Sequence, residues 1–121
     1  MPRSLALRNV IVTTLLVLAL WLLPSARAAD QAPTPSVNAA VIGSVFGPRY
    51  ARQAVRVAWC ESRLTTTARN GQYRGLFQMG SWERRRFGHG STAQAQARAA
   101  HRYFVVTGRD WSPWSCRHAA T

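Results

Sequence analysis

The stretch from Trp59 to Met79 reads WCESRLTTTARNGQYRGLFQM. It contains Glu61, one of only four acidic residues in a chain of 121. Four residues lead up to this point at spacings of four, three and four along the chain, namely Tyr50, Ala54, Val57 and Glu61. Such spacing predicts an amphipathic helix, and the β-branched threonines that follow Ser62 predict its end. Glu61 therefore continues the apolar face of its own helix and lies in the last turn.

The predicted position of Glu61 has a chemical consequence. Burial disfavours a carboxylate, and the negative end of the helix dipole disfavours it again. A carboxyl group that keeps its proton near neutral pH can act as a general acid. The alternative is an ion pair with Arg63 or another arginine, which would favour the carboxylate instead. Periodicity alone leaves both interpretations open.

Downstream of Glu61 the pattern changes from helix to hairpin and back. Asn70-Gly71 is a two-residue hairpin signal, with residues 73–79 as the return strand. Gly75 within that strand indicates a bulge or a place where a ligand approaches the backbone. Two helices should follow, over 82–87 after Ser81 and from a capping box at Ser91 to a stop at Gly108. The predicted fold class is α+β, mainly α, with one short β-hairpin.

The first 28 residues read as an export signal. Arg3 and Arg8 precede the uncharged run Val10–Leu23, and an Ala-x-Ala cleavage site ends at Ala28. A helix over that run would span about 21 Å, short of the roughly 30 Å of a membrane's hydrocarbon core, which disfavours a permanent anchor. We expect residues 1–28 to be a cleaved signal peptide, 29–40 a linker and 41–118 the folded domain. The mature chain would be secreted and would not stay inserted in a membrane.

The chain is strongly basic, with a formal net charge of +12, and it contains no lysine. Removal of residues 1–28 takes away three arginines and leaves +9. This charge predicts attraction to polyanions. For a secreted protein these would be anionic cell-wall polymers or anionic lipid surfaces, and export argues against nucleic acid. The arginines are scattered, so a solvated cationic surface is the simpler interpretation.

Cys60 and Cys116 are the only cysteines. In a small exported chain a disulfide is the default over a free thiol or a metal site. This bridge would close a loop of 57 residues, counting both cysteines, and stabilise the fold by roughly 4 kcal/mol. The three histidines stand at no spacing that would make a metal site with the cysteines, and we expect no metal and no cofactor.

Three motifs occur in a fixed order: Glu61-Ser62, Gly75-Leu76-Phe77-Gln78 and Ala100-His101-Arg102-Tyr103. Together they resemble the lysozyme-like lytic transglycosylases of the soluble, Slt type. A cysteine directly before the glutamate, with another in a Trp-x-x-Trp-x-Cys tail, looks more like the resuscitation-promoting-factor branch of secreted actinobacterial wall hydrolases. The resemblance covers roughly residues 41–116. It departs after Ser62, where the Slt-type pattern usually continues with Asn-Pro and this chain has Arg-Leu-Thr-Thr.

The resemblance implies a small lysozyme-like domain that cleaves the β-1,4 bond between N-acetylmuramic acid and N-acetylglucosamine in peptidoglycan. Glu61 matches the catalytic acid of the family, which also serves as the base when the C6 hydroxyl of the sugar attacks the anomeric carbon. This single-acid mechanism suits a chain so poor in carboxylates, because glycoside hydrolysis commonly uses two. The other acids look poorly placed, since Asp30 falls in the linker, Glu83 in a surface-like helix and Asp110 in the tail.

The resemblance also points to residues that bind the glycan strand. Gln78 matches a glutamine that lines the sugar cleft, although it could instead cap the hairpin. Tyr103 matches a tyrosine that orients the catalytic carboxylate, although it could be a core aromatic. Gly75 and Phe77 belong to the same motif and are candidate contacts to the substrate. The alternative for Phe77 is the hydrophobic core, where a phenylalanine is more often found. Trp111 and Trp114 are expected to be structural, packed beside the disulfide.

Two other functions remain possible from the sequence. The first is a non-catalytic cationic protein that binds wall glycan on a lysozyme-like fold. The second is a membrane-active cationic protein, which would call for a strongly basic amphipathic helix. The predicted helix over 93–107 has only Arg98 and Arg102 as basic residues, which argues against the second. We expect a monomeric, cell-wall-associated enzyme.

Overall fold

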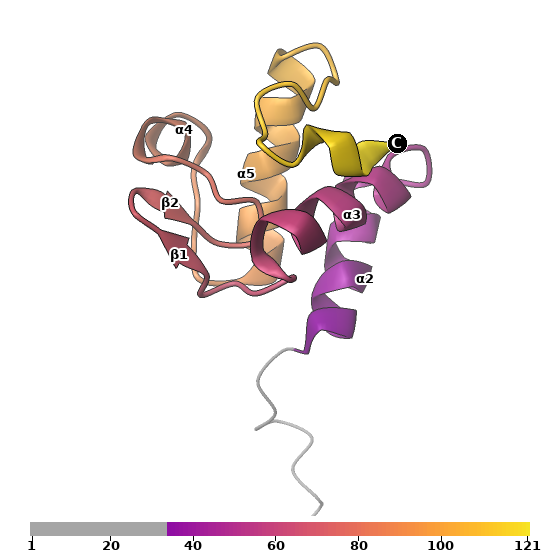
Figure 1. Cartoon of the computed structure of the whole chain (residues 1–121), viewed down its shortest axis with the longest axis horizontal. Helices are drawn as coiled ribbons and strands as arrows, with labels where there is room; N and C mark the ends of the chain where they lie inside the picture. Colours follow the sequence, from indigo (N-terminus) through magenta and orange to yellow (C-terminus); the bar gives the residue numbers. More distant parts are fainter. Residues whose placement is uncertain (1–33) are drawn as a thin grey trace, which may run out of the picture. The chain divides into compact units, whose positions relative to one another are not determined.

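A computed structural model of the chain describes residues 34–121 (Figure 1). These residues form four α-helices, one two-stranded antiparallel hairpin and a short 3-10 helix, and Cys60 and Cys116 form a disulfide. The elements are α2 (Pro35–Phe46), α3 (Ala51–Ser62), β1 (Arg69–Asn70), β2 (Tyr73–Arg74), α4 (Ser81–Phe87), α5 (Ala93–Val106) and η1 (Arg117–Ala120). The expected α+β, mainly helical fold with a short hairpin and one disulfide is confirmed.

Helix α2 begins inside the segment expected to be a linker. The Oγ1 of Thr34 accepts the backbone N–H of Val37 and so caps the helix. Pro35 follows as the first helical residue, where its missing N–H costs nothing. Of the residues expected to form a linker over 29–40, Pro35 is instead the first residue of α2, and residues 35–40 are helical. The predicted signal peptide and residues 29–33 lie outside the described part of the chain.

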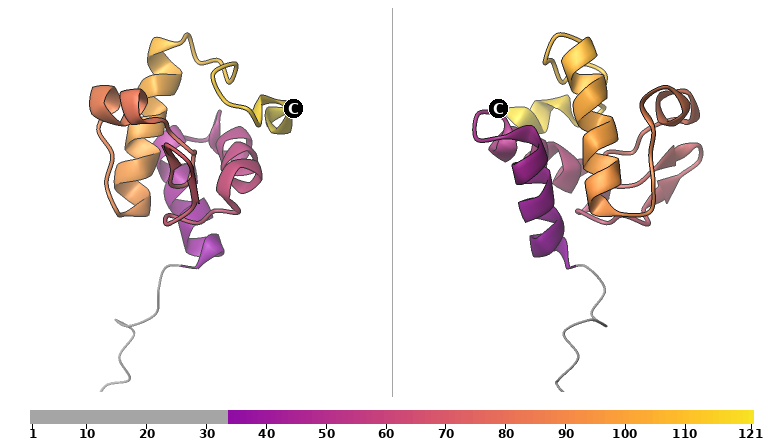
Figure 2. Two further views of the ribbon diagram at one scale, coloured as in Figure 1. Left: turned by 60° about the vertical axis from the view of Figure 1, so that its left-hand side comes forward. Right: turned by 180° about the vertical axis from the view of Figure 1, so that it is seen from behind.

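The helices surround one core, with α2 packed against both α3 and α5 (Figure 2). Helix α5 also contacts α4 on its other side, and η1 lies on α3. This brings the end of the chain back onto the helix that carries Glu61. Within residues 34–121 no helix has both the length and the apolar character needed to cross a membrane.

Aromatic side chains fill the centre of the core. Phe77 stacks on Phe46 with ring centroids 5.5 Å apart, and Trp111 packs on Phe104 at 4.5 Å. The indole N–H of Trp111 donates to Gln53, as the indole of Trp114 donates to the Phe77 carbonyl. Both tryptophans thus bury their rings while satisfying their one donor, as expected for structural residues.

The hairpin is shorter than predicted and its loop is shifted by one residue. Asn70 pairs with Tyr73, so the two loop residues are Gly71 and Gln72 rather than Asn70 and Gly71. The return strand ends at Arg74, because the chain turns again and brings Met79 back into a bridge with Arg74. Gly75, with φ 79°, provides the left-handed backbone that this second turn requires.

Helix α5 begins one residue later than the capping box suggested. Thr92, not Ser91, is the cap, and its Oγ1 accepts the N–H of Ala95. Helix α4 begins at Ser81 with Gly80 as its cap residue.

Candidate active site

A groove of about 510 Å³ contains Glu61. One side consists of the hairpin, the turn after it and the start of α4. The other side consists of the tail, the segment between α5 and η1, through its residues 113–115. Glu61, Glu83 and Tyr103 line it together with residues 68–70, 73, 78–80, 113–115 and 117. Elements from nearly the whole described chain thus converge on one polar depression large enough for a ligand.

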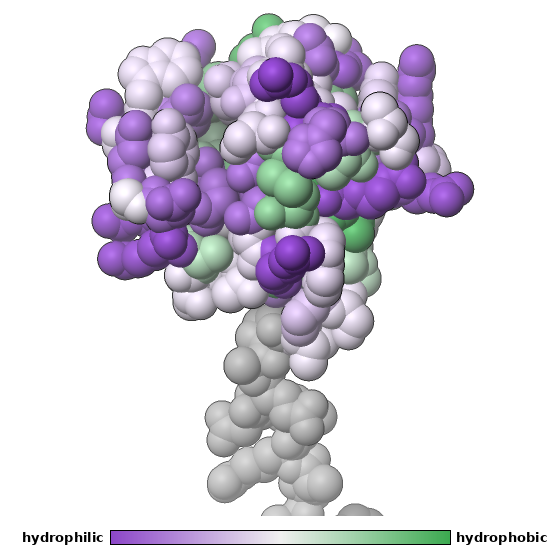
Figure 3. All heavy atoms as spheres, viewed as in Figure 1, coloured by the Kyte–Doolittle hydropathy of each residue, from purple (hydrophilic) through white to green (hydrophobic). Residues whose placement is uncertain are grey.

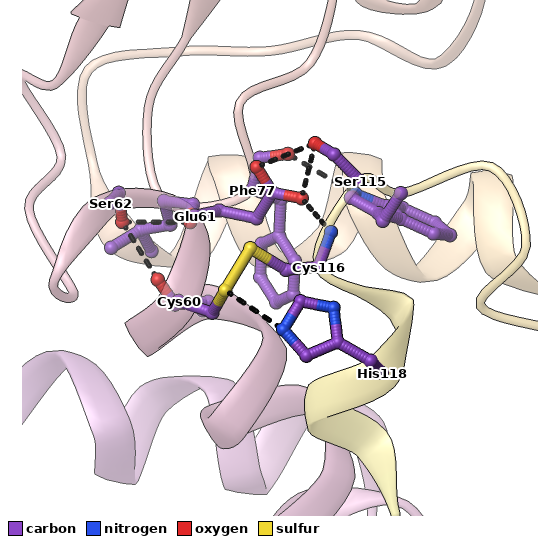
Figure 4. Close-up of a disulfide and its surroundings, with 10 residues drawn as sticks. Cys60, Glu61, Ser62, Phe77, Ser115, Cys116 and His118 are labelled. Carbon is purple, nitrogen blue, oxygen red and sulfur yellow. Dashed lines mark hydrogen bonds between the residues drawn. A yellow bond between two sulfur atoms is a disulfide. The ribbon is translucent and has the colours of Figure 1, made fainter.

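Glu61 lies in the last turn of α3, half-buried in the groove. Its Oε1 accepts the backbone N–H of Cys116 at 2.9 Å, and the hydroxyl of Ser115 lies 3.2 Å from Oε1 and 3.4 Å from Oε2 (Figure 4). These partners come from the tail rather than from an arginine, so the ion pair considered from the sequence is not what holds this carboxyl group. One side of the group is fixed and the other faces the groove.

The residues on either side of Glu61 anchor the end of its helix. Cys60 forms the disulfide with Cys116, whose Cα lies 5.9 Å from its own. Ser62 donates its hydroxyl to the carbonyl of Leu76 at 2.8 Å. The Glu-Ser pair is therefore tied physically to the Gly-Leu-Phe-Gln turn, which explains why the two motifs occur together.

Gln78 lines the groove and also bonds to the turn that carries it, and its contact with a sugar stays a prediction. Its side chain lines the groove, and its amide donates to the carbonyls of Ala68 at 3.2 Å and Gly75 at 3.0 Å. Both amide hydrogens are used on the backbone, so what Gln78 can offer a ligand is its carbonyl oxygen.

Gly75 and Phe77 are brought into the core instead of the groove. Phe77 is 1% exposed and packs among the central aromatics. A Cβ added to Gly75 would lie only 2.4 Å from Oε1 of Gln96, so this glycine is required for packing. The expectation that both contact the substrate is wrong, because the turn directs them away from the depression that Gln78 lines.

Gln96 is the residue behind this turn, and none of the sequence motifs includes it. It is 2% exposed, its Oε1 accepts the N–H of Leu76 at 2.9 Å, and its Nε2 donates to the carbonyls of Thr66 and Gly90. The one sequence feature that could have indicated this role is a glutamine among the alanines of the predicted helix. Its hydrogen bond to Leu76 fixes the turn over residues 75–78 and so positions Gln78.

Tyr103 lines the groove from α5, between the rings of Phe87 and Trp114. Burial raises the pKa of its hydroxyl, and the charge of Glu83 raises that pKa further. The phenol therefore stays protonated and can donate a hydrogen bond. The hydrogen bonds to the Glu61 carboxylate come from Ser115 and Cys116, and the orienting role expected of Tyr103 stays a prediction.

Glu83 is the residue that the sequence interpretation discarded. It stands in the first turn of α4, half-buried, and it lines the same groove as Glu61. A Cβ on Gly80 would lie 2.5 Å from Oε2 of Glu83, so the glycine leaves room for the carboxylate at the helix N-terminus. The surface-like pattern of the short helix hid the fact that its first turn faces the groove.

The arrangement offers one carboxyl group fixed on one side, a second across the same groove, and donors from Tyr103 and the tail. Among the described residues, no group of three or more His, Cys, Asp and Glu side chains is placed to hold a metal ion. Acid–base chemistry on a polar, extended ligand is what such a site can perform.

Residues 38–116 match the family model described as Lysozyme like domain. No curated protein and no solved structure gave a significant match to the chain. The matched segment begins in α2 and ends at the second cysteine, so it includes every residue of the groove except Arg117. The closer likeness to the resuscitation-promoting-factor branch stays a prediction.

Proposed function

The chain belongs to the lysozyme-like domain family, and from this we propose that it is a secreted enzyme that cleaves the β-1,4 bond between N-acetylmuramic acid and N-acetylglucosamine in peptidoglycan. The observation that carries the proposal is the carboxyl group of Glu61, which is held by the tail on one side and open to the groove on the other.

In the proposed reaction the protonated carboxyl of Glu61 gives its proton to the glycosidic oxygen. The bond from the anomeric carbon to that oxygen breaks, its electron pair stays on the departing oxygen, and an oxocarbenium-like state develops on the sugar. The C6 hydroxyl of the same sugar then attacks the anomeric carbon and returns its proton to Glu61. The product is an anhydro sugar, and Glu61 is ready for the next cycle.

The groove supports binding of a glycan strand along its length. The Gln78 carbonyl oxygen and the Tyr103 hydroxyl both line it, and sugar hydroxyl and acetamido groups can pair with such atoms. Trp114 also lines it, although the indole N–H is already used on Phe77.

Hydrolysis is the second candidate outcome, favoured by the presence of Glu83 in the same groove. In inverting glycosidases a second carboxylate activates a water on the opposite face of the sugar. With Glu83 in that role, the attacking oxygen would come from water and the product would carry a reducing end instead of an anhydro ring.

The alternative to an enzyme is a cationic protein that has the same fold and binds wall glycan but does not cleave it. The net charge of +9 beyond residue 28 would hold either protein near anionic cell-wall polymers. The two functions differ in whether release of peptidoglycan fragments depends on Glu61.

The test is digestion of purified peptidoglycan, with released fragments identified by mass spectrometry. Wild type, Glu61→Gln and the control Asp110→Asn, which changes an exposed acid of the tail, should be compared. Anhydro-muramyl ends from wild type and the control, and none from Glu61→Gln, would establish the transglycosylase. Reducing ends with the same dependence would establish the hydrolase. Binding without release by all three proteins would overturn the catalytic proposal.

A further inference from the structure

Helix α3 carries an exposed aromatic and basic surface that the groove does not use. Trp59 is 48% exposed, and it borders a shallow hollow of about 540 Å³ together with Arg56, Arg63 and apolar atoms of Val55 and Ala119. None of residues 34–121 lines both this hollow and the groove. Figure 4 shows the disulfide between Glu61 on one side and His118, which belongs to the hollow, on the other.

The hollow continues along α3 instead of closing. A second depression of about 430 Å³ shares Val55 and Arg56 with it and extends to Arg52 and Gly43. Figure 3 shows apolar surface set among strongly hydrophilic side chains over α3 and the C-terminal segment. An elongated apolar strip with basic edges fits a chain-like ligand better than a compact one.

The arginines follow the strip at helical spacing. Arg52, Arg56 and Trp59 lie on successive turns of α3, about 5.4 Å apart along the axis, and Arg63 is the cap residue directly after the helix. None of the acidic side chains described, Glu61, Glu83 and Asp110, lines the two depressions. The strip therefore carries three arginines and is complementary to an elongated ligand that bears several negative charges.

Arg63 is held in place at a conformational cost. It has φ 53°, and Leu64 after it has φ 58°, both in the left-handed region that non-glycine residues rarely occupy. The Nδ2 of the buried Asn38 donates to the Leu64 carbonyl at 2.8 Å and so fixes this turn. The result is that the Arg63 guanidinium lies 5.2 Å from the centroid of the Trp59 ring.

A glycine would suit the helix end at residue 63 better than arginine does. The strain of a left-handed non-glycine residue is kept where surrounding structure or function demands it. Here the arginine places a positive charge beside an exposed indole, so an apolar face and a cation lie next to each other on the surface. An indole offers its face to the C–H groups of the ring, and a guanidinium forms a two-pronged pair with a carboxylate.

We propose that the strip of Arg52, Arg56, Trp59 and Arg63 binds a linear polysaccharide whose rings carry carboxylate groups. This deepens the proposed function, since it gives a wall-bound enzyme a polymer site separate from its catalytic groove. It does not depend on turnover, and binding can be measured on the Glu61→Gln protein. Failure of cleavage and failure of binding are then separate results.

The experiment measures binding of Glu61→Gln protein to polygalacturonate, poly-L-glutamate and dextran by isothermal titration. The first has charge and sugar rings, the second charge alone, and the third rings alone. Polygalacturonate should bind most tightly. Trp59→Ala, added to Glu61→Gln, should weaken that binding about tenfold, as loss of a central aromatic contact commonly does. It should leave the weaker binding of poly-L-glutamate unchanged.

Two further variants keep the test sharp. Arg63→Gly should weaken polygalacturonate binding while the melting temperature stays the same or rises, because glycine relieves the left-handed strain. Trp82→Ala is the matched control, since Trp82 is 57% exposed beside arginines of α4 and lies away from the strip.

Equal losses of polygalacturonate binding in Trp59→Ala and Trp82→Ala would overturn the proposal in favour of general charge attraction. Equal affinity for polygalacturonate and poly-L-glutamate would do the same. Loss of binding to phosphatidylglycerol vesicles but not to polygalacturonate in Trp59→Ala would overturn it in favour of a lipid surface.

Discussion

The backbone N–H of Cys116 donates a 2.9 Å hydrogen bond to Oε1 of Glu61, while the sulfur of Cys116 is bonded to Cys60, the residue that precedes Glu61. The tail is therefore attached to the same helical turn twice, once covalently and once through the carboxyl group. The position of the tail and the orientation of the candidate acid are one structural unit.

Ser115→Ala tests the second contact of this unit. Its hydroxyl lies within hydrogen-bonding distance of both carboxyl oxygens, and its removal leaves the Cys116 N–H as the remaining tail donor. Turnover on peptidoglycan should fall by roughly two- to tenfold, since such a bond contributes about 0.5–1.5 kcal/mol. Ser112→Ala is the control, because that exposed serine bonds through its backbone and not its hydroxyl. Equal rates for the two variants would show that Ser115 has no positioning role.

Replacement of Cys60 and Cys116 by alanine tests the covalent contact. The bridge joins residues 56 apart in sequence, so its loss should lower the free energy of unfolding by about 4 kcal/mol in the chain-entropy treatment. Denaturant titration measures this loss. Turnover measured well below the unfolding transition should fall as well, because the tail that holds Glu61 is released. A variant with full turnover in its folded state would contradict the coupling of disulfide and acid.

Much of this unit could be predicted from the sequence. The spacing of Tyr50, Ala54, Val57 and Glu61 predicted the helix, and the pairing of the two cysteines was the default for a chain expected to be exported. What could not be predicted was the identity of the Glu61 partners, because Ser115 lies 54 residues away and reaches it only through the fold. Tyr103 was assigned that role by resemblance, which carries a residue type and not a distance.

Glu83→Gln tests the carboxylate across the groove. If Glu83 activates water, the variant should release fewer reducing ends and relatively more anhydro ends than wild type does. The ratio of the two products, measured by mass spectrometry, separates this effect from a general loss of rate. A stability effect alone would lower both products together, since an acid in the first turn of α4 also stabilises the helix by roughly 0.3–1 kcal/mol. An unchanged ratio would remove Glu83 from the chemistry.

Gln96→Leu tests the support of the turn that carries Gln78. The variant leaves the Leu76 N–H and the carbonyls of Thr66 and Gly90 without their partner in a buried site. The free energy of unfolding should fall by about 2–4 kcal/mol, since each buried unsatisfied group costs roughly 1–3 kcal/mol and some will find water. Gln94→Leu, at an exposed position of the same helix, should change it far less. Equal effects in a denaturant titration would mean that Gln96 is not the anchor.

The roles of Gln96 and Gly75 show where reasoning from the sequence stops. A glycine in a predicted strand indicates a bulge or a ligand equally well, and only the Gln96 side chain against it decides between them. Prolines in the predicted linker were likewise ambiguous, since Pro35 starts a helix once Thr34 caps it. In each case the deciding contact is made by a residue whose own position depends on the completed fold.

The stability of the fold should fall as the pH drops through the range of histidine. Burial lowers the pKa of His89 and of His101, and nearby arginines lower both further. Both are therefore neutral in the folded state at a pH where the unfolded chain, with a histidine pKa of about 6.5, begins to bind protons. Because the unfolded state binds more protons below about pH 6.5, the free energy of unfolding declines as the pH falls below that value. Above it, these two histidines do not change the free energy of unfolding with pH.

His101→Phe keeps the edge contact with Phe46, whose ring centroid lies 5.0 Å away, and removes the proton site. Combined with His89→Gln, it should reduce the drop in melting temperature between pH 7.5 and pH 5.5, measured by calorimetry. An identical drop in wild type and the double variant would show that these histidines do not control the acid sensitivity of the domain.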